Sequence, residues 1–266
     1  MLEESFEWLD QKQCSAYLER LGLSWPRELS REFLDQLIRT HLEKIPFENL
    51  DLVKTHEVIP TDLESIYNKI VLNRRGGYCF ELNALLLGLL RGIGFEAYPV
   101  ACRVLMRPGL RMPTHRASVV CLNDRKYFCD VGYGGIACTR AAWMETGSVT
   151  ETEFGSFYFE RECFGWLNFW YQSKKQGGEE PVKIFMISEV PSAPVDFAPA
   201  NEAMCRKGSM FYDKMIVQKI TSYGPVSIDG DHFTLRGKDG KTVSVISSKT
   251  ELQDILKREF QIEFTL

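Results

Sequence analysis

The sequence lacks most of the features that assign a protein to a special class. Its formal net charge is −4, without any excess of basic residues, which argues against nucleic acid or an anionic membrane as a main partner. The N-terminal stretch MLEESFEWLDQKQC is acidic, unlike a signal peptide, and the longest apolar run, 84–90, is too short to span a bilayer. Internal repeats and low-complexity tracts are also missing. We therefore expect a globular cytoplasmic protein.

Paired cysteine motifs are missing as well. The eight cysteines are spread along the chain without a single CxxC pair, so neither a zinc ribbon nor a small disulfide framework is indicated. We expect free thiols and no metal. A free cysteine usually packs as a small buried hydrophobe, so a reactive one must be recognised from its surroundings.

The secondary-structure pattern of the sequence changes twice along the chain. Residues 1–95 show helical periodicity: one apolar face over 33–45 ends at Pro46, and Thr61 with Glu64 forms a capping-box signature for a second helix. Residues 96–200 are rich in β-branched and aromatic segments typical of strands in a barrel or sandwich. Residues 201–266 mix strands with a final amphipathic helix. The pattern predicts an α+β protein of three closely packed parts.

One cysteine lies in an unusual segment, RRGGYCFELN at 74–83. A third helix is expected to begin at Cys79, where free N–H groups and the helix dipole favour an anion such as a thiolate. Gly76 and Gly77 would let the backbone turn sharply and leave clearance for a group approaching the sulfur. The alternative is that this glycine pair only ends the preceding helix. The local sequence leaves both interpretations open.

A nucleophilic thiolate normally needs a histidine that is oriented by a third group. Only four histidines exist. His41 falls on the 33–45 helix, where a half-buried structural role is expected, and His56 and His232 lie in polar loop or turn segments. His115 differs because it opens the strand-like segment HRASVVCL. It is the candidate base.

A hairpin supplies the third group. If Asn123 and Asp124 form a two-residue turn, Asp130 falls opposite Ala117 and is the diagonal same-face neighbour of His115. Side chains bridge such diagonal positions, which lie about 7–8 Å apart. A three-residue loop would place Asp130 on the other face and remove the contact. The alternative for Asp130 is a simple carboxylate at a strand end.

Together these motifs resemble the arylamine N-acetyltransferase family, in its bacterial form. RRGGYCFELN is similar to the family's nucleophile segment, THRASVVCL to its histidine segment and FCDVGYGG to its aspartate segment. IPFENLD at 45–51 and PVDFAPAN at 194–201 are further similar stretches, so the resemblance extends over most of the chain.

The resemblance implies a fold and a reaction. The fold is a helical bundle (1–95) carrying the nucleophile, a central β-barrel (96–200) carrying the histidine and aspartate, and a C-terminal α/β lid (201–266). The reaction is acetylation of arylamines, arylhydroxylamines and hydrazines from acetyl-CoA, by a ping-pong route through an acetyl-cysteine. Such chemistry belongs to xenobiotic metabolism, with acetyl-CoA as co-substrate.

The resemblance also implies residue roles. Cys79 would be the nucleophile, His115 the general base and acid, and Asp130 the group that orients the imidazole. Arg75 would pair with Glu48 as a structural support. Backbone N–H groups at the helix start, including that of Cys79, are candidates for stabilising the oxyanion.

Contacts to the two substrates are expected from a further set of residues. Phe47 and Tyr133 would form aromatic walls for the acceptor, with core packing as the alternative for each. The segment NEAMCRKGSMF lacks the Ser-Thr-His-Pro stretch that contacts CoA in many bacterial members of the family. The candidates for binding CoA are therefore Gly132, Tyr133, Arg111 and Arg206, with Lys207 beside the last.

Three other functions remain open at this stage. Relatives that act as amide synthases transfer a different acyl thioester, which the altered 201–211 stretch would suit. Papain-like hydrolases and transglutaminases use the same three residue types, with water or a lysine as second nucleophile. A non-catalytic member would merely bind CoA or a protein.

Overall fold

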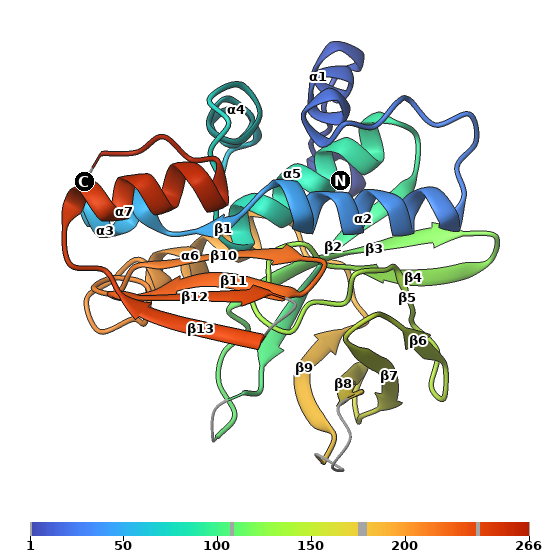
Figure 1. Cartoon of the computed structure of the whole chain (residues 1–266). Helices are drawn as coiled ribbons and strands as arrows, with labels where there is room; N and C mark the ends of the chain where they lie inside the picture. Colours follow the sequence, from blue (N-terminus) through green and yellow to red (C-terminus); the bar gives the residue numbers. More distant parts are fainter. Residues whose placement is uncertain (1, 107–108, 175–179, 238–239, 266) are drawn as a thin grey trace.

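Helices cover two antiparallel sheets in the computed structural model, which describes residues 2–106, 109–174, 180–237 and 240–265 (Figure 1). Within these ranges no helix combines the length and apolar character needed to cross a membrane. The α-helices are α1 (Gln11–Leu21), α2 (Arg31–Lys44), α3 (Leu50–Thr55), α4 (Leu63–Tyr67), α5 (Cys79–Gly92), α6 (Ala198–Met204) and α7 (Lys249–Ile255). Short 3₁₀ or π turns are η1 (Glu3–Ser5), η2 (Asn68–Leu72), η3 (Pro194–Phe197) and η4 (Leu256–Phe260).

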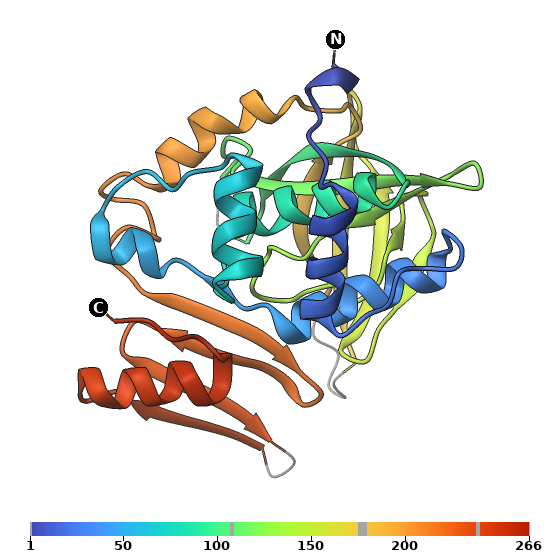
Figure 2. The same ribbon diagram turned by 90° about the horizontal axis from the view of Figure 1, so that it is seen from above.

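Helix α5 is the central helix of the fold. All of its residues from 79 to 90 are buried, and it passes beneath α1 and α4 when the molecule is viewed from above (Figure 2). Because its buried residues, most of them apolar, lie around the whole circumference, the helix has to be covered on every side. Its other side packs on strands β2 and β3, so the start of α5 is held between the helical layer and the larger sheet.

The larger sheet is a nearly closed barrel of eight antiparallel strands, in the order β5-β4-β3-β2-β9-β8-β7-β6. Its interior is packed with phenylalanines, among them Phe128, Phe169 and Phe185. The strands are β2 (Glu96–Val104), β3 (His115–Leu122), β4 (Arg125–Cys129), β5 (Ala142–Trp143), β6 (Val149–Glu151), β7 (Gly155–Arg161), β8 (Trp166–Ser173) and β9 (Val182–Ser188).

The smaller sheet joins the two ends of the chain. Its order is β1-β10-β11-β12-β13, and α7 packs on it through a cluster that includes Val217, Ile228 and Leu252. Strand β1 comes from the N-terminal region, so the helical part and the C-terminal part share this sheet. The strands are β1 (Phe47–Glu48), β10 (Ile216–Thr221), β11 (Gly224–Asp229), β12 (His232–Gly237) and β13 (Gly240–Val245). That 1–95, 96–200 and 201–266 are separate domains remains a prediction.

Most predicted element ends agree with the structure. Helix α2 stops at Lys44, just before Pro46, and α5 begins at Cys79. One capping prediction is wrong: α4 is capped by Asp62, whose carboxylate accepts a hydrogen bond of 2.8 Å from the N–H of Ser65, and not by Thr61. Aspartate is an equally good N-cap, and here it lies one residue closer to the helix.

The hairpin between β3 and β4 has the predicted two-residue turn. Leu122 pairs with Arg125 and Ser118 with Cys129, which leaves only Asn123 and Asp124 in the loop. Both have positive φ, of 52° and 58°, as a type I′ turn requires, and Asn and Asp tolerate this conformation better than most residues. The predicted register is therefore confirmed.

His41 is more deeply buried than the predicted half-buried position. It is 0% exposed, the Tyr17 ring packs edge-on at 5.9 Å, and neither ring nitrogen has a hydrogen-bond partner among the described residues. Burial, assisted by the nearby charge of Arg20, lowers the pKa of His41 from 6.5 to about 3. The ring is therefore neutral in the folded protein at physiological pH.

Acid is expected to destabilise the protein through His41. His41 binds a proton below pH 6.5 in the unfolded chain, but only below about pH 3 in the folded chain. The free energy of unfolding therefore falls as the pH drops through this window. Between pH 7 and pH 5 the free energy of unfolding should fall by about 2 kcal/mol more in the wild type than in His41→Leu. Urea unfolding at the two pH values measures this difference. Equal pH dependence in the two proteins would contradict it.

Candidate active site

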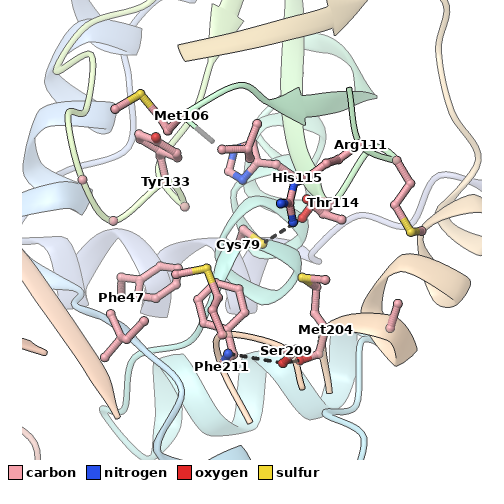
Figure 3. Close-up of a pocket in the computed structure, with 18 of the residues that line it drawn as sticks. Phe47, Cys79, Met106, Arg111, Thr114, His115, Tyr133, Met204, Ser209 and Phe211 are labelled. Carbon is pink, nitrogen blue, oxygen red and sulfur yellow. Dashed lines mark hydrogen bonds between the residues drawn. The ribbon is translucent and has the colours of Figure 1, made fainter. Parts of the chain in front are cut away.

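Cys79 is the first residue of α5 and lines a large pocket (Figure 3). The pocket encloses about 870 Å³. The residue is only 4% exposed, and its Sγ lies 3.8 Å from the carbonyl oxygen of Thr114. The thiol thus combines a helix N-terminus with a confined, largely apolar cavity.

His115 and Asp130 meet beside this thiol. Nε2 of His115, the first residue of β3, donates a hydrogen bond of 2.8 Å to Oδ2 of Asp130, which directly follows β4. Both residues are buried. The contact predicted across the hairpin is present, and it leaves the other ring nitrogen of His115 free for a hydrogen bond with Cys79.

The charge on His115 is set by opposing effects. Burial lowers the pKa of the ring, but the carboxylate of Asp130 and the hydrogen bond with Cys79 outweigh it and raise this pKa from 6.5 to about 10. Phe185 stacks on the imidazole at 4.8 Å with an interplanar angle of 9°, which limits rotation of the ring. At neutral pH the site therefore favours an imidazolium ring held in one orientation.

Asn83 is a site residue that the sequence predictions missed. It is completely buried one helical turn after Cys79. Its Nδ2 donates to Oδ1 of Asp130 at 2.8 Å, and its Oδ1 accepts from the N–H of Val131 at 3.0 Å. The spacing of four residues in CFELN was the available signal, because such residues share one helix face. Asn83 thereby fixes the carboxylate that orients His115.

Replacing Asn83 with leucine should disturb this orientation. A misplaced Asp130 is expected to lower kcat for acetyl transfer about 10²-fold, with a smaller change in KM. Since Asp130 also keeps His115 charged, the alkaline limb of the pH–rate profile should move to lower pH. Steady-state kinetics across pH measures both effects, with Asn68→Leu on the exposed surface of η2 as control. An unshifted profile would mean that Asn83 serves stability alone.

Two glycine segments pack closely around the site. A Cβ at Gly132 would lie 2.9 Å from Cα of Cys79, and one at Gly134, where φ is +73°, would lie 2.8 Å from the Phe47 ring. A Cβ at Gly76 would lie 2.1 Å from the backbone oxygen of Pro46. We expected the space beside Gly76 to admit a group approaching the sulfur. That expectation is wrong for Gly76, because the backbone of Pro46 fills this space.

The predicted pair of Glu48 and Arg75 belongs to a larger charge network beneath α5. Nη2 of Arg75 lies 2.7 Å from Oε1 of Glu48 and 3.0 Å from Asp51. Lys69 extends the network with contacts of 2.8 Å to Asp51 and to Glu81 in the first turn of α5. The network thus connects the β1 segment, the turn before Cys79 and α5.

Arg75→Leu should destabilise the protein by about 3 kcal/mol, because the fully buried Glu48 would lose its closest cation. Lys69 lies 4.0 Å from Glu48 and replaces only part of this interaction. Denaturant unfolding measures the loss, and Arg75→Lys, which keeps the charge, should recover part of it. A change below about 0.5 kcal/mol, as for a surface pair, would count against a supporting role.

The structure brings together most of the predicted substrate contacts. Phe47, Tyr133 and Arg111 line the pocket (Figure 3), and so do Gly132 and Lys207. Arg206 does not belong to this lining. Its side chain follows the end of α6, is 73% exposed and pairs at 3.0 Å with Glu202 of that helix. No group of three or more potential metal ligands occurs within the described ranges.

Known proteins are similar to this chain in sequence and in architecture. The N-acetyltransferase family model matches residues 31–266. The arylamine N-acetyltransferase of Escherichia coli is 35% identical over 153 residues, which are 57% of this chain and 54% of that protein. In sequence, the chain therefore spans about half the length of the curated relatives it matches.

Solved structures extend the likeness to nearly the whole fold. The arylamine N-acetyltransferase of Salmonella typhimurium is similar with a TM-score of 0.87 and 25% identity, over 96% of this chain and 93% of that chain. That of Mycobacterium marinum in complex with CoA shares the fold, with a TM-score of 0.84 and 23% identity over 94% and 93% of the two chains. With its match from residue 31 to residue 266, this chain belongs to the arylamine N-acetyltransferase family.

Proposed function

We propose that this protein acetylates arylamines, arylhydroxylamines and hydrazines from acetyl-CoA, by a ping-pong mechanism through acetyl-Cys79. The carrying observation is that Cys79 and His115 line the same pocket, with Nε2 of His115 hydrogen-bonded to Oδ2 of Asp130 at 2.8 Å. Membership of the family favours an acyltransferase over the hydrolase and non-catalytic alternatives.

The first half-reaction transfers the acetyl group to the enzyme. An imidazolium next to sulfur and the start of α5 both stabilise a thiolate at Cys79, which attacks the thioester carbonyl. Backbone N–H groups at the helix start, including that of Cys79, are assigned to the oxyanion. When the intermediate collapses, the C–S bond to CoA breaks, the CoA sulfur takes the proton of His115, and a new thioester remains on Cys79.

The second half-reaction returns the enzyme to its starting state. His115, now neutral, accepts a proton from the attacking amine as its nitrogen bonds to the acetyl carbon. Collapse of this intermediate breaks the bond to Cys79 and regenerates the thiolate beside an imidazolium. Conversion of a thioester to an amide is downhill and drives the cycle. The low exposure of Cys79 limits competing hydrolysis by water.

The pocket lining supports a division between the two substrates. We assign the phosphates of CoA to Arg111 and Lys207, which line the pocket, rather than to the exposed Arg206. Gly132 and Tyr133 would contact the thioester end, and Phe47 and Tyr133 the aromatic acceptor, which stacks well on such rings. The CoA complex of the Mycobacterium marinum relative is consistent with this co-substrate.

Mass spectrometry of the acylated protein tests the proposal directly. Incubation with acetyl-CoA alone should release one equivalent of CoA and place an acetyl group on the Cys79 peptide. Addition of 4-methylaniline should then remove the acetyl group, and initial-rate plots should be parallel, as for any ping-pong reaction. Folded protein that gains no acetyl group on Cys79 would refute the acetyl-CoA mechanism.

A larger acyl donor is a second candidate, favoured by the methionines of the pocket. Met106, Met112, Met204 and Met210 all contribute to its lining, and unbranched methionine side chains adapt to ligands of different shape. An amide synthase acting on a bulkier acyl thioester would use the same three residues. Higher kcat/KM with benzoyl-CoA than with acetyl-CoA would favour this candidate.

A further inference from the structure

One buried side chain of the 45–51 segment has no role in the reaction described above. Asn49 is 3% exposed and occupies the N-cap position of α3. An asparagine at this position usually accepts a hydrogen bond from an N–H of the first helical turn. Within the described residues the side chain of Asn49 makes no such bond. It is directed toward another part of the chain.

The amide of Asn49 bonds to three backbone groups of one distant segment. Its Nδ2 donates to the carbonyl oxygens of Phe211 at 2.7 Å and Lys214 at 2.8 Å. Its Oδ1 accepts from the N–H of Ile216 at 2.7 Å. Residues 205–215, which lead into β10, form only turns and bends, so their backbone groups depend on partners outside a regular ladder. Asn49 thus holds this segment against the end of β1.

The segment held by Asn49 supplies an aromatic wall of the active-site pocket. Phe211 is partly exposed and lines the pocket together with Cys79. Its ring lies beside that of Phe47, with 6.0 Å between the centroids (Figure 3). It also packs edge-on against Tyr78, the residue before Cys79, at 6.1 Å. An aromatic acceptor that stacks on Phe47 within reach of Cys79 would therefore meet the Phe211 ring as well.

The backbone of Phe211 is held at both of its polar groups. Its N–H donates to Oγ of Ser209 at 3.2 Å, and its carbonyl accepts from Nδ2 of Asn49. Ser209 belongs to the same irregular segment and moves with it, whereas Asn49 belongs to the N-terminal part of the chain. The hydrogen bond from Asn49 therefore ties the position of the Phe211 ring to that of Phe47, two residues before Asn49.

We propose that Asn49 is a positioning residue for the acceptor: it holds the 211–216 segment so that Phe211 and Phe47 form one wall for an aromatic ring. This inference rests on the proposed acetyl transfer and adds a residue that determines its preference for acceptors with a ring over acceptors without one. When Asn49 is removed, the segment is free to shift and an aromatic acceptor loses one ring contact.

Two acceptors of different shape isolate this effect. 4-Methylaniline carries a ring that stacks on the wall, whereas hydrazine has none. In Asn49→Ala the ratio of kcat/KM for 4-methylaniline to kcat/KM for hydrazine should fall about tenfold, as expected for one lost aromatic contact, with a higher KM for 4-methylaniline. This ratio does not depend on the fraction of folded protein. Asn168→Ala, which removes an equally buried, hydrogen-bonded asparagine of β8, should keep the wild-type ratio.

A double-mutant cycle tests whether Asn49 acts through Phe211. Phe211→Leu alone should lower the same ratio about tenfold. Asn49→Ala added to Phe211→Leu should lower it little further, because the ring that Asn49 positions is already missing. Fully additive losses would mean that Asn49 affects the acceptor by another route, and they would overturn the proposal.

Alkylation of Cys79 separates this inference from the proposed reaction, because it needs no acetyl-CoA. The thiolate displaces iodide from iodoacetamide or from iodoacetanilide, which carries a phenyl ring, and a C–S bond forms in each case. The rate with iodoacetanilide relative to iodoacetamide, followed on the Cys79 peptide by mass spectrometry, should fall about tenfold in Asn49→Ala. Such a fall in a protein that acetyl-CoA does not acetylate would support the role of Asn49 and refute the proposed reaction. Acetylated Cys79 with unchanged ratios would overturn the role of Asn49 alone.

Two further results would decide against Asn49. A fall of the ratios in Asn168→Ala equal to that in Asn49→Ala would mean that they respond to any loss of stability. Asn49→Ser replaces Asn49→Ala should the alanine variant fail to fold, with the same expected result. If neither variant folds, Asn49 is required for the fold as a whole, and its specific role at the pocket is overturned.

Discussion

Replacement of Cys79 by serine is expected to reduce kcat/KM for acetyl transfer by at least about 10⁴-fold, as is usual for loss of a covalent nucleophile. Serine keeps the size of the side chain, but its hydroxyl is far less acidic than a thiol. The imidazolium of His115 and the start of α5 would therefore face a neutral oxygen instead of a thiolate. Release of CoA from acetyl-CoA in the presence of 4-methylaniline measures the effect.

The matched control is Cys163→Ser, which changes an exposed free cysteine in the same way. It should leave the rate and the acetyl-Cys79 peptide unchanged. Unfolding of Cys79→Ser should resemble that of the wild type, so that lost activity does not reflect lost structure. Transfer by Cys79→Ser at more than about a hundredth of the wild-type rate would indicate direct attack of the amine on acetyl-CoA instead of a covalent intermediate.

Asp130→Asn should have the second largest effect, a loss of about 10⁴-fold in kcat, the magnitude known for the equivalent change in a hydrolytic triad. The amide cannot supply the negative charge that keeps the buried His115 protonated. Its NH₂ group also favours the wrong tautomer of the ring. We expect slow acetylation of Cys79 at neutral pH and an alkaline limb of the pH–rate profile that moves well below pH 10.

The hairpin offers a control for this variant. Asp124→Asn makes the same chemical change in the exposed turn between β3 and β4, where asparagine also tolerates the positive φ of 58°. It should keep wild-type kinetics. If Asp130→Asn retained the wild-type pH profile, the charge of Asp130 would be unnecessary and the carboxylate would act only as a spacer.

The predictions from sequence succeeded where neighbouring residues carry the information. The Asn123-Asp124 turn determines the register of β3 and β4, and with it the approach of Asp130 to His115. Pro46 and the glycine pair before Cys79 similarly mark the ends of α2 and the start of α5. Where two adjacent residues can both cap a helix, as Thr61 and Asp62 can, local sequence was not sufficient.

From the sequence alone we predicted three candidate catalytic residues, the helix start and hairpin that carry them, and the family to which the chain belongs. The contacts between distant segments became visible in the folded structure: Asn83 holds Asp130, Gly76 makes room for Pro46, and Lys207 but not Arg206 lines the pocket. The reason is physical: turns and helix ends depend on a few adjacent residues, whereas burial and hydrogen-bond pairing depend on side chains that packing brings together from distant parts of the chain.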